Sequence, residues 1–161
     1  MTLPVNQPEE WCKDGLRFGC VGCGNCCTGG PGYVWITEEE TKRIAEHLQL
    51  TPAQVLRQYG RKVSGHIGLK EKRPNSRGEY DCVFLEEIPV ENDTQKIRRI
   101  CTIYPVRPLQ CRTWPFWNSN LASPHAWAGA GKRCPGVGKG RVWTREEMLA
   151  RQNATQWPEE R

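Results

Sequence analysis

The stretch Phe18-Gly-Cys-Val-Gly-Cys-Gly-Asn-Cys-Cys-Thr-Gly-Gly30 places four cysteines, Cys20, Cys23, Cys26 and Cys27, within eight residues. Two residues separate each of the first three thiols from the next, and this spacing lets neighbouring thiolates converge on one metal ion. The glycines between them permit the tight turns, including positive φ, that such wrapping needs. A flexible glycine-rich loop is the alternative, but it does not account for the regular spacing. The stretch therefore predicts a metal site.

The composition indicates a small folded domain with a thin apolar core. The 161 residues fit one domain, and Leu, Ile, Val and Phe together number only 30. A net charge of +5 is too modest to indicate disorder, and seven Trp residues are present. Metal binding would then supply folding free energy that the core lacks. We expect an irregular, metal-stabilised α+β domain.

Charge and cysteine usage restrict the class of protein. The formal charge of +5 counts every Cys as neutral, and metal-bound thiolates would offset much of it. We therefore expect no nucleic-acid partner. The first residues resemble no secretory signal and no segment is long enough to cross a membrane, which predicts a cytoplasmic chain with reduced thiols. An odd count of nine Cys disfavours the alternative, a secreted disulfide scaffold.

Two successive capping boxes predict two adjacent helices. Thr37 with Glu40 opens a helix over about 37–50, and Thr51 opens another over about 51–60. A third box predicts a C-terminal helix that starts at Thr144.

Short strands are expected between these helices, and two of them carry cysteines. A strand over 80–85 would contain Cys82, and a returning strand over 97–100 would deliver Cys101. Further strands are predicted over 33–36 and 67–70. We expect a flexible tail at 1–10, the cysteine-cluster domain at 11–153 and a polar tail at 154–161.

A second chemical centre is predicted around Cys101 and Cys111, which lie ten positions apart with two prolines between them. Arg107 and Arg112 flank the pair; they could bind an anionic substrate, offset thiolate charge, or pair with Asp81 or a nearby Glu. Four aromatic residues nearby either form a dry wall around the metal or are simply core. These are Tyr104, Trp114, Phe116 and Trp117.

These motifs together resemble the YkgJ-type cysteine-cluster (CxxCxxCC) family over roughly residues 11–142. They are Cys20-x-x-Cys23-Gly-x-Cys26-Cys27, Cys82-Val-Phe-Leu, Cys101-x-x-Tyr-x-x-Arg107-Pro-x-x-Cys111-Arg112 with Pro115, and Cys134-Pro-Gly. The family is described as a zinc- or iron-chelating domain. The resemblance implies eight metal ligands and leaves Cys12 outside the pattern. The eight are Cys20, Cys23, Cys26, Cys27, Cys82, Cys101, Cys111 and Cys134.

Three functions are compatible with this resemblance. The first is an iron–sulfur protein, with a 4Fe–4S cluster and a redox or accessory role, because the C-x2-C-x2-C spacing matches the start of a bacterial ferredoxin run. The second is a structural zinc domain that acts as an interaction module. The third, a methyltransferase-like protein, rests on family analogy alone. The sequence leaves open whether the chain is an oxidoreductase or an accessory protein, and which redox or protein partner it has.

The eight thiols suggest either two four-cysteine centres or one cluster with spare thiols. Adjacent side chains point to opposite sides of an extended backbone, so we expect Cys26 and Cys27 to serve different centres; a tight turn is the alternative and would bring them together. One predicted centre contains Cys20, Cys23, Cys26 and Cys134. The other contains Cys27, Cys82, Cys101 and Cys111. The three histidines are scattered and indicate no catalytic site.

Overall fold

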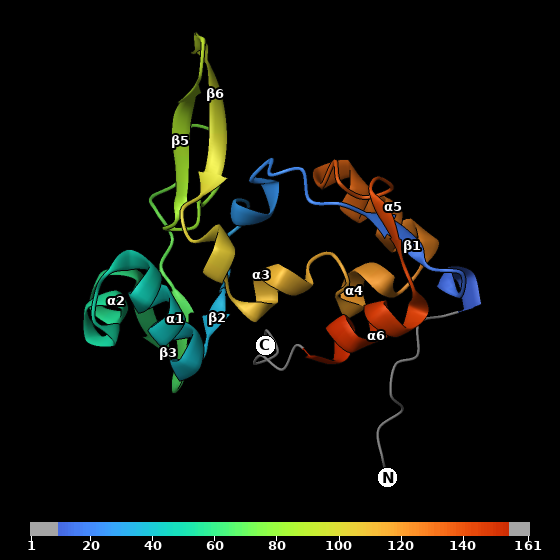
Figure 1. The fold of residues 1–161 in the computed structure, drawn as a ribbon, viewed down its shortest axis with the longest axis horizontal. Coiled ribbons are helices and arrows are strands. Elements are labelled where there is room, and N and C mark those ends of the chain that lie inside the picture. Colours follow the sequence, from blue (N-terminus) through green and yellow to red (C-terminus); the bar gives the residue numbers. More distant parts are fainter. Residues whose placement is uncertain (1–9, 155–161) are drawn as a thin grey trace. The chain divides into compact units, whose positions relative to one another are not determined.

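The computed structural model describes residues 10–154 and shows a mixed α+β protein with short antiparallel strands (Figure 1). The chain forms two compact units. The central unit comprises Gly22–Arg112, and the terminal unit combines the chain up to Val21 with the chain from Thr113 onward. The predicted tails fall almost wholly outside the described residues. The predicted domain limits of 11 and 153 stay predictions.

The central unit pairs two helices with a small antiparallel sheet. Its elements are η2 Asn25–Cys27, β2 Trp35–Ile36, α1 Glu38–Leu48, α2 Pro52–Tyr59, β3 Gly60–Val63, β4 His66–Leu69, β5 Leu85–Val90, β6 Asp93–Cys101, η3 Tyr104–Val106 and α3 Leu109–Thr113. The three-stranded sheet has the order β2-β4-β3, and β5 and β6 form a separate hairpin.

The two helices begin where their capping boxes predict. The Thr37 hydroxyl accepts from the Glu40 N–H, and the Glu40 carboxylate accepts from the Thr37 N–H. Thr51 and Gln54 make the same reciprocal pair at the start of α2. Each box satisfies two backbone N–H groups that a helix start leaves unpaired. The predicted pair of adjacent helices is therefore confirmed.

The core of the central unit lies between these helices and the sheet. Ile44 and Val55 are fully buried, and Leu69 is 2% exposed. Cys82 and Cys101 pack against the same apolar cluster. The core and the thiols are therefore one continuous packing unit.

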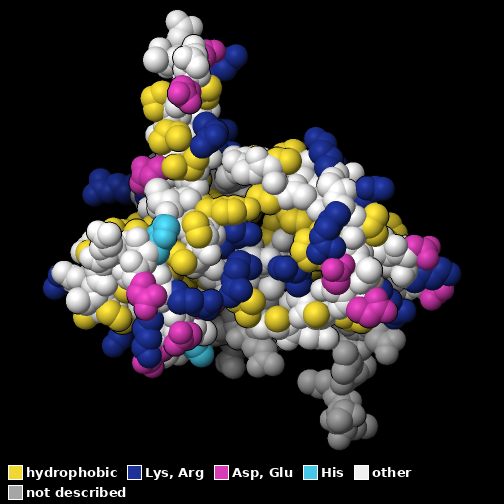
Figure 2. Space-filling model, in the orientation of Figure 1, with side chains coloured by type: hydrophobic (Ala, Val, Ile, Leu, Met, Phe, Trp, Pro, Cys, Tyr) yellow, Lys and Arg dark blue, Asp and Glu magenta, His cyan; other side chains and the backbone are white. Residues whose placement is uncertain are grey.

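The β5–β6 hairpin extends away from the helices of the central unit (Figure 1). Its register pairs Leu85 with Cys101 at the base, which carries Cys101 to the foot of the hairpin as predicted. Hydrophobic side chains lie exposed along its stem (Figure 2), and Ile97 is 63% exposed. The base of the hairpin is thus the buried part, because Leu85 is only 3% exposed.

The terminal unit joins segments from both ends of the chain. Strand β1, Leu16–Phe18, pairs antiparallel with β7, Arg141–Trp143. Phe116, at 0% exposure, is the centre of an aromatic core. The centroid of its ring lies 5.1 Å from the ring centroid of Trp143. The other elements of this unit are η1 Glu10–Cys12, α4 Asn118–Leu121, α5 Pro124–Arg133 and α6 Arg145–Ala154.

The structure confirms some local predictions and corrects others. The C-terminal helix is α6, and Thr144 and Glu147 form its capping box. The predicted strand over 80–85 is wrong, because Cys82 makes only an isolated bridge with Glu71 and a turn follows it. Helices α4 and α5 were not predicted. None of the helices within residues 10–154 has the length and apolar character needed to span a bilayer.

Truncating a buried core residue of the central unit should destabilise it. Ile44→Ala removes a fully buried side chain between α1 and the sheet. We expect the free energy of unfolding to fall by about 2–5 kcal/mol, because a cavity remains. Urea unfolding followed by circular dichroism measures this change. The matched control is Ile97→Ala on the exposed hairpin, which should change the free energy by less than about 0.5 kcal/mol. Equal effects at the two positions would contradict this assignment of the core.

Candidate metal centre

The cysteine loop of the central unit is a tight turn pressed against the hairpin. Gly24 has φ 74°, and the short helix η2 follows it. A Cβ atom at Gly24 would lie 3.1 Å from Cβ of Arg99 and 3.1 Å from Cδ1 of Leu85. The Cys27 N–H donates to the Gly24 carbonyl at 3.0 Å. Only glycine combines this left-handed φ with so close an approach.

Backbone pairing brings Cys82 to this loop. The Cys82 N–H donates to the Cys27 carbonyl at 2.7 Å, and the Tyr80 N–H donates to the Gly29 carbonyl at 2.7 Å. These two bonds lay residues 80–82 alongside residues 27–29. The Cys27 and Cys82 thiols therefore come from directly paired segments.

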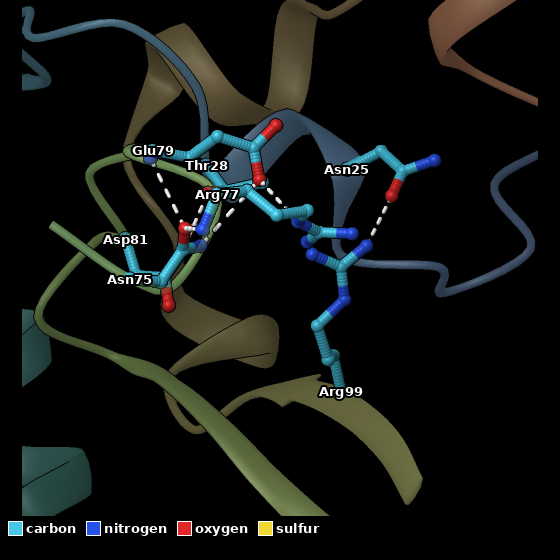
Figure 3. Close-up of polar contacts among 7 residues, drawn as sticks. All are labelled: Asn25, Thr28, Asn75, Arg77, Glu79, Asp81 and Arg99. Atoms are coloured by element: carbon cyan, nitrogen blue, oxygen red, sulfur yellow. Dashed lines mark hydrogen bonds and ion pairs between the residues drawn. The ribbon is translucent and has the colours of Figure 1, made fainter.

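A polar network fixes this pairing (Figure 3). Asp81 accepts hydrogen bonds from the Thr28 hydroxyl and from Nδ2 of Asn75, the latter at 3.3 Å. Oδ1 of Asn75 accepts from the N–H groups of Arg77 and Glu79 at 2.9 and 3.0 Å. Because Thr28 follows Cys27 and Asp81 precedes Cys82, the network holds the two cysteines in register.

Cys101 reaches the loop from the end of β6. It lies opposite Leu85 in the hairpin register. Two residues earlier, the Arg99 guanidinium donates to Oδ1 of Asn25 (Figure 3). The foot of the hairpin is therefore tied to η2, which contains Cys26 and Cys27.

Cys111 lies on α3, and its two preceding residues anchor that helix. The buried carboxylate of Glu40, 5% exposed, accepts from the Leu109 N–H at 2.7 Å. Oε1 of Gln110 accepts from the Trp35 N–H at 2.9 Å. The Glu40 carboxylate thus caps α1 and also holds the start of α3.

Five thiols from these four segments interact with one another. Sγ of Cys26 lies 3.9 Å from Sγ of Cys27, and the Cys27 thiol is hydrogen-bonded to Cys101. Electrostatic repulsion from Cys82, Cys26 and Cys101 contributes to the raised pKa of Cys111. The prediction that Cys26 and Cys27 point to opposite sides is wrong, because they lie in a 3₁₀ turn and not in an extended segment. The structure brings together one group of thiols that includes Cys26.

The pKa values of these thiols differ in direction. Burial raises the pKa of Cys82 to about 11 and also raises that of Cys111. The hydrogen bond from Cys27 lowers the pKa of Cys101 to about 7, and the same bond raises the pKa of Cys27 because Cys27 keeps the proton. Among Cys27, Cys82, Cys101 and Cys111, the thiol of Cys101 therefore ionises most readily.

Backbone N–H groups point at three sulfur atoms, in each case from two residues further along the chain. Such bonds favour the thiolate, which is the form that binds metal. The pairs are Asn25 with Cys23 at 3.4 Å, Phe84 with Cys82, and Ile103 with Cys101.

The donor set suits zinc or iron, both of which bind four thiolates tetrahedrally. With metal–sulfur bonds of about 2.3 Å, tetrahedral sulfurs lie about 3.8 Å apart. The 3.9 Å between Cys26 and Cys27 is of this size. Among residues 10–154, no three Cys, His, Asp or Glu side chains are already arranged as a metal site. Binding would therefore require the thiols to turn toward a common point.

Of the four other cysteines, Cys23 belongs to the central unit, and Cys12, Cys20 and Cys134 belong to the terminal unit. Cys20 and Cys134 lie near the contact in which the Gly19 N–H donates to the Gly136 carbonyl at 3.1 Å. Metal binding by Cys20, Cys23 and Cys134 stays a prediction. Cys12 is 1% exposed within the aromatic core.

The flanking arginines and aromatic residues have distinct roles. Arg107 lies 3.8 Å over the Tyr104 ring, and its charge lowers the pKa of Cys101. Arg112 approaches Glu40, with 3.9 Å between Nη2 and Oε1. Asp81 is held by Thr28 and Asn75, so of the two predicted partners, Asp81 or a nearby Glu, it is Glu40 that pairs with Arg112. The predicted dry wall is wrong for Tyr104, which is 43% exposed. The other three members, Trp114, Phe116 and Trp117, belong to the terminal unit.

Several positioning residues carry no clear signal in the sequence. Glu40 was predicted only as a helix cap, and its bond to Leu109 depends on tertiary structure. Thr28 and Asp81 could have been noticed because each is adjacent to a cysteine. The contact between Arg99 and Asn25 joins residues 74 positions apart, which no local pattern predicts.

Removing the Glu40 carboxylate should loosen α3. In Glu40→Ala the N–H groups of Leu109 and Thr37 lose their acceptor, and both hydrogen bonds are partly buried. A fully buried donor left unpaired costs about 1–3 kcal/mol, so we expect destabilisation near the lower end of this range in urea unfolding. Glu39→Ala is the matched control because Glu39 is exposed on the same helix turn. Similar stability of the two variants would contradict an anchoring role for Glu40.

Comparison with known proteins agrees with this site. The family model CxxCxxCC, described as "Putative zinc- or iron-chelating domain", matches residues 19–135. "Uncharacterized protein MJ0661" of Methanocaldococcus jannaschii is 34% identical over 104 residues, which cover 64% of this chain and 47% of that protein. The chain therefore spans about half the length of this relative. No solved structure matches.

The matched region contains all eight cysteines that the spacing and motifs singled out, and it leaves Cys12 outside. The resemblance first seen in the motifs is thereby confirmed. The chain belongs to the CxxCxxCC family of zinc- or iron-chelating domains.

Proposed function

We propose that this chain is an iron–sulfur protein with a redox or accessory role, and that its resident ligands include Cys27, Cys82, Cys101 and Cys111. The observation that carries this proposal is the meeting of these thiols from a loop, an isolated bridge, a hairpin foot and a helix. Thiols from four separate segments of the chain lie near one another. Packing of the core alone would not require a cysteine in each of these segments.

Two features favour an iron–sulfur cluster over a single ion. The C-x2-C-x2-C spacing of Cys20, Cys23 and Cys26 matches the start of a bacterial ferredoxin run. Backbone N–H groups directed at sulfur are among the features that set the potential of such clusters. When bound, the cluster would supply one-electron transfer. The chain's own residues orient the thiolates, partly bury Cys82 and Cys111, and place the positive charge of Arg107 beside Cys101.

A zinc centre is the second candidate, and one distance favours it. The separation of 3.9 Å between the Cys26 and Cys27 sulfurs matches two ligands of one tetrahedral ion. Zinc has no redox chemistry, so the domain would then act as a structural module that binds a partner protein. In either case we propose a cytoplasmic setting in which the thiols stay reduced.

Metal analysis of anaerobically purified protein distinguishes the candidates. We expect brown protein that contains iron and acid-labile sulfide. Cys82→Ser should lose metal, because it removes a buried ligand between two paired segments. Cys12→Ala should keep it, since Cys12 lies in the core of the terminal unit. Colourless protein with stoichiometric zinc and no sulfide, even after reconstitution with iron and sulfide, would sink the iron–sulfur proposal and leave the zinc one.

Metal affinity should rise steeply with pH. The pKa values of Cys27, Cys82 and Cys111 are raised, so these thiols are protonated at pH 7, and Cys101, with a pKa of about 7, is half protonated. Binding to all four would release roughly three to four protons near pH 7, and the affinity should gain about tenfold per pH unit for each proton. Zinc competition against a chelating dye between about pH 6 and pH 8 measures the slope. A slope below about two protons would contradict this ligand set.

A further inference from the structure

One thiol of the group differs from the others in its access to solvent. Cys26 is exposed, whereas Cys27, Cys82, Cys101 and Cys111 are at least half-buried. A tetrahedral ion takes four ligands, and the group offers five thiols. The group therefore contains one thiol beyond a full ligand set, and that thiol lies on the solvent side.

The geometry connects this exposed thiol to the buried ones through Cys27. Sγ of Cys27 lies 3.9 Å from Sγ of Cys26, and either sulfur can donate the hydrogen bond. The same Cys27 thiol is hydrogen-bonded to Cys101. Because about 3.8 Å separates two thiolates bound to one ion, Cys26 and Cys27 can reach the same metal atom.

Cys23, the remaining thiol of this loop, is held differently. Its sulfur accepts the N–H of Asn25 at 3.4 Å, and its side chain is less exposed than that of Cys26. Cys26, by contrast, is exposed and places its sulfur 3.9 Å from the Cys27 sulfur. Cys26 is therefore the loop thiol that combines solvent exposure with contact to the group.

We propose that Cys26 is an exchange ligand through which the central unit hands its metal to an external thiolate acceptor. This inference rests on the proposed centre of Cys27, Cys82, Cys101 and Cys111. In the exchange a bond forms between Cys26 Sγ and the metal while the bond to Cys27 Sγ breaks, and the Cys26 proton passes to the Cys27 sulfur. The acceptor's thiolate then displaces the remaining protein ligands one by one, and each released sulfur takes a proton from water. No electron is transferred.

The test follows zinc release from full-length protein loaded with one Zn²⁺ per chain. Zinc is the probe because it is redox-silent, so its release needs no oxidant or reductant. Anaerobic protein is mixed with increasing concentrations of a small dithiol, and a zinc-sensitive dye reports the transfer rate. Cys26→Ser is compared with wild type and with Cys12→Ala, whose cysteine lies in the terminal unit.

We expect Cys26→Ser to retain one zinc per chain but to release it about tenfold or more slowly, the scale on which groups adjacent to a metal site act. Release from wild type and from Cys12→Ala should accelerate with dithiol concentration. If Cys26→Ser retains zinc and transfers it at the wild-type rate, the exchange role is overturned and the centre stands. If Cys26→Ser no longer holds zinc, Cys26 is a resident ligand and the exchange role is again overturned. If wild type binds no zinc, the exchange role is overturned, and the iron and sulfide analysis of the purified protein decides separately whether the proposed centre stands.

Discussion

The hydrogen bond between the thiols of Cys27 and Cys101 joins the two parts of the central unit on which its chemistry depends. One thiol belongs to the tight glycine loop and the other to the foot of the hairpin. The approach is close because Gly24 has no side chain to meet Leu85 and Arg99. A Cβ atom at that position would lie 3.1 Å from Cβ of Arg99 and 3.1 Å from Cδ1 of Leu85, so these neighbours would have to shift by a few tenths of an ångström.

Burial of these thiols connects the site to the stability of the unit. Cys82 and Cys101 pack against the apolar core formed by α1, α2 and the sheet. Burial favours their protonated form, as the raised pKa of Cys82 shows. A bound metal would replace the protons and stabilise the folded state of a unit whose core is small. If Cys82 and Cys101 bind metal as proposed, the same two side chains serve both core packing and metal binding.

The buried carboxylate of Glu40 shows how a helix cap can serve a site. One oxygen completes the capping box with Thr37, and the other accepts from Leu109 at the start of the helix that carries Cys111. A charged group at 5% exposure needs such partners, because an unpaired buried charge is costly. The nearby guanidinium of Arg112 adds partial compensation. The position of Cys111 thus follows from a helix that begins some seventy residues earlier in the chain.

The sequence by itself determined the features that depend on short-range physics. Thr37, Thr51 and Thr144 mark helix starts because a side chain caps backbone groups only three residues away. The thiol spacing likewise indicated metal chemistry and the family, because ligand spacing along a loop is local.

Tertiary structure alone decided which thiols meet. Cys26 and Cys27 come together in a turn that the sequence did not distinguish from an extended segment, and Cys82 lies in a bridge whose partner is supplied by residue 71. The pairing of β1 with β7 was equally inaccessible, because antiparallel register between distant segments depends on packing and not on local preference.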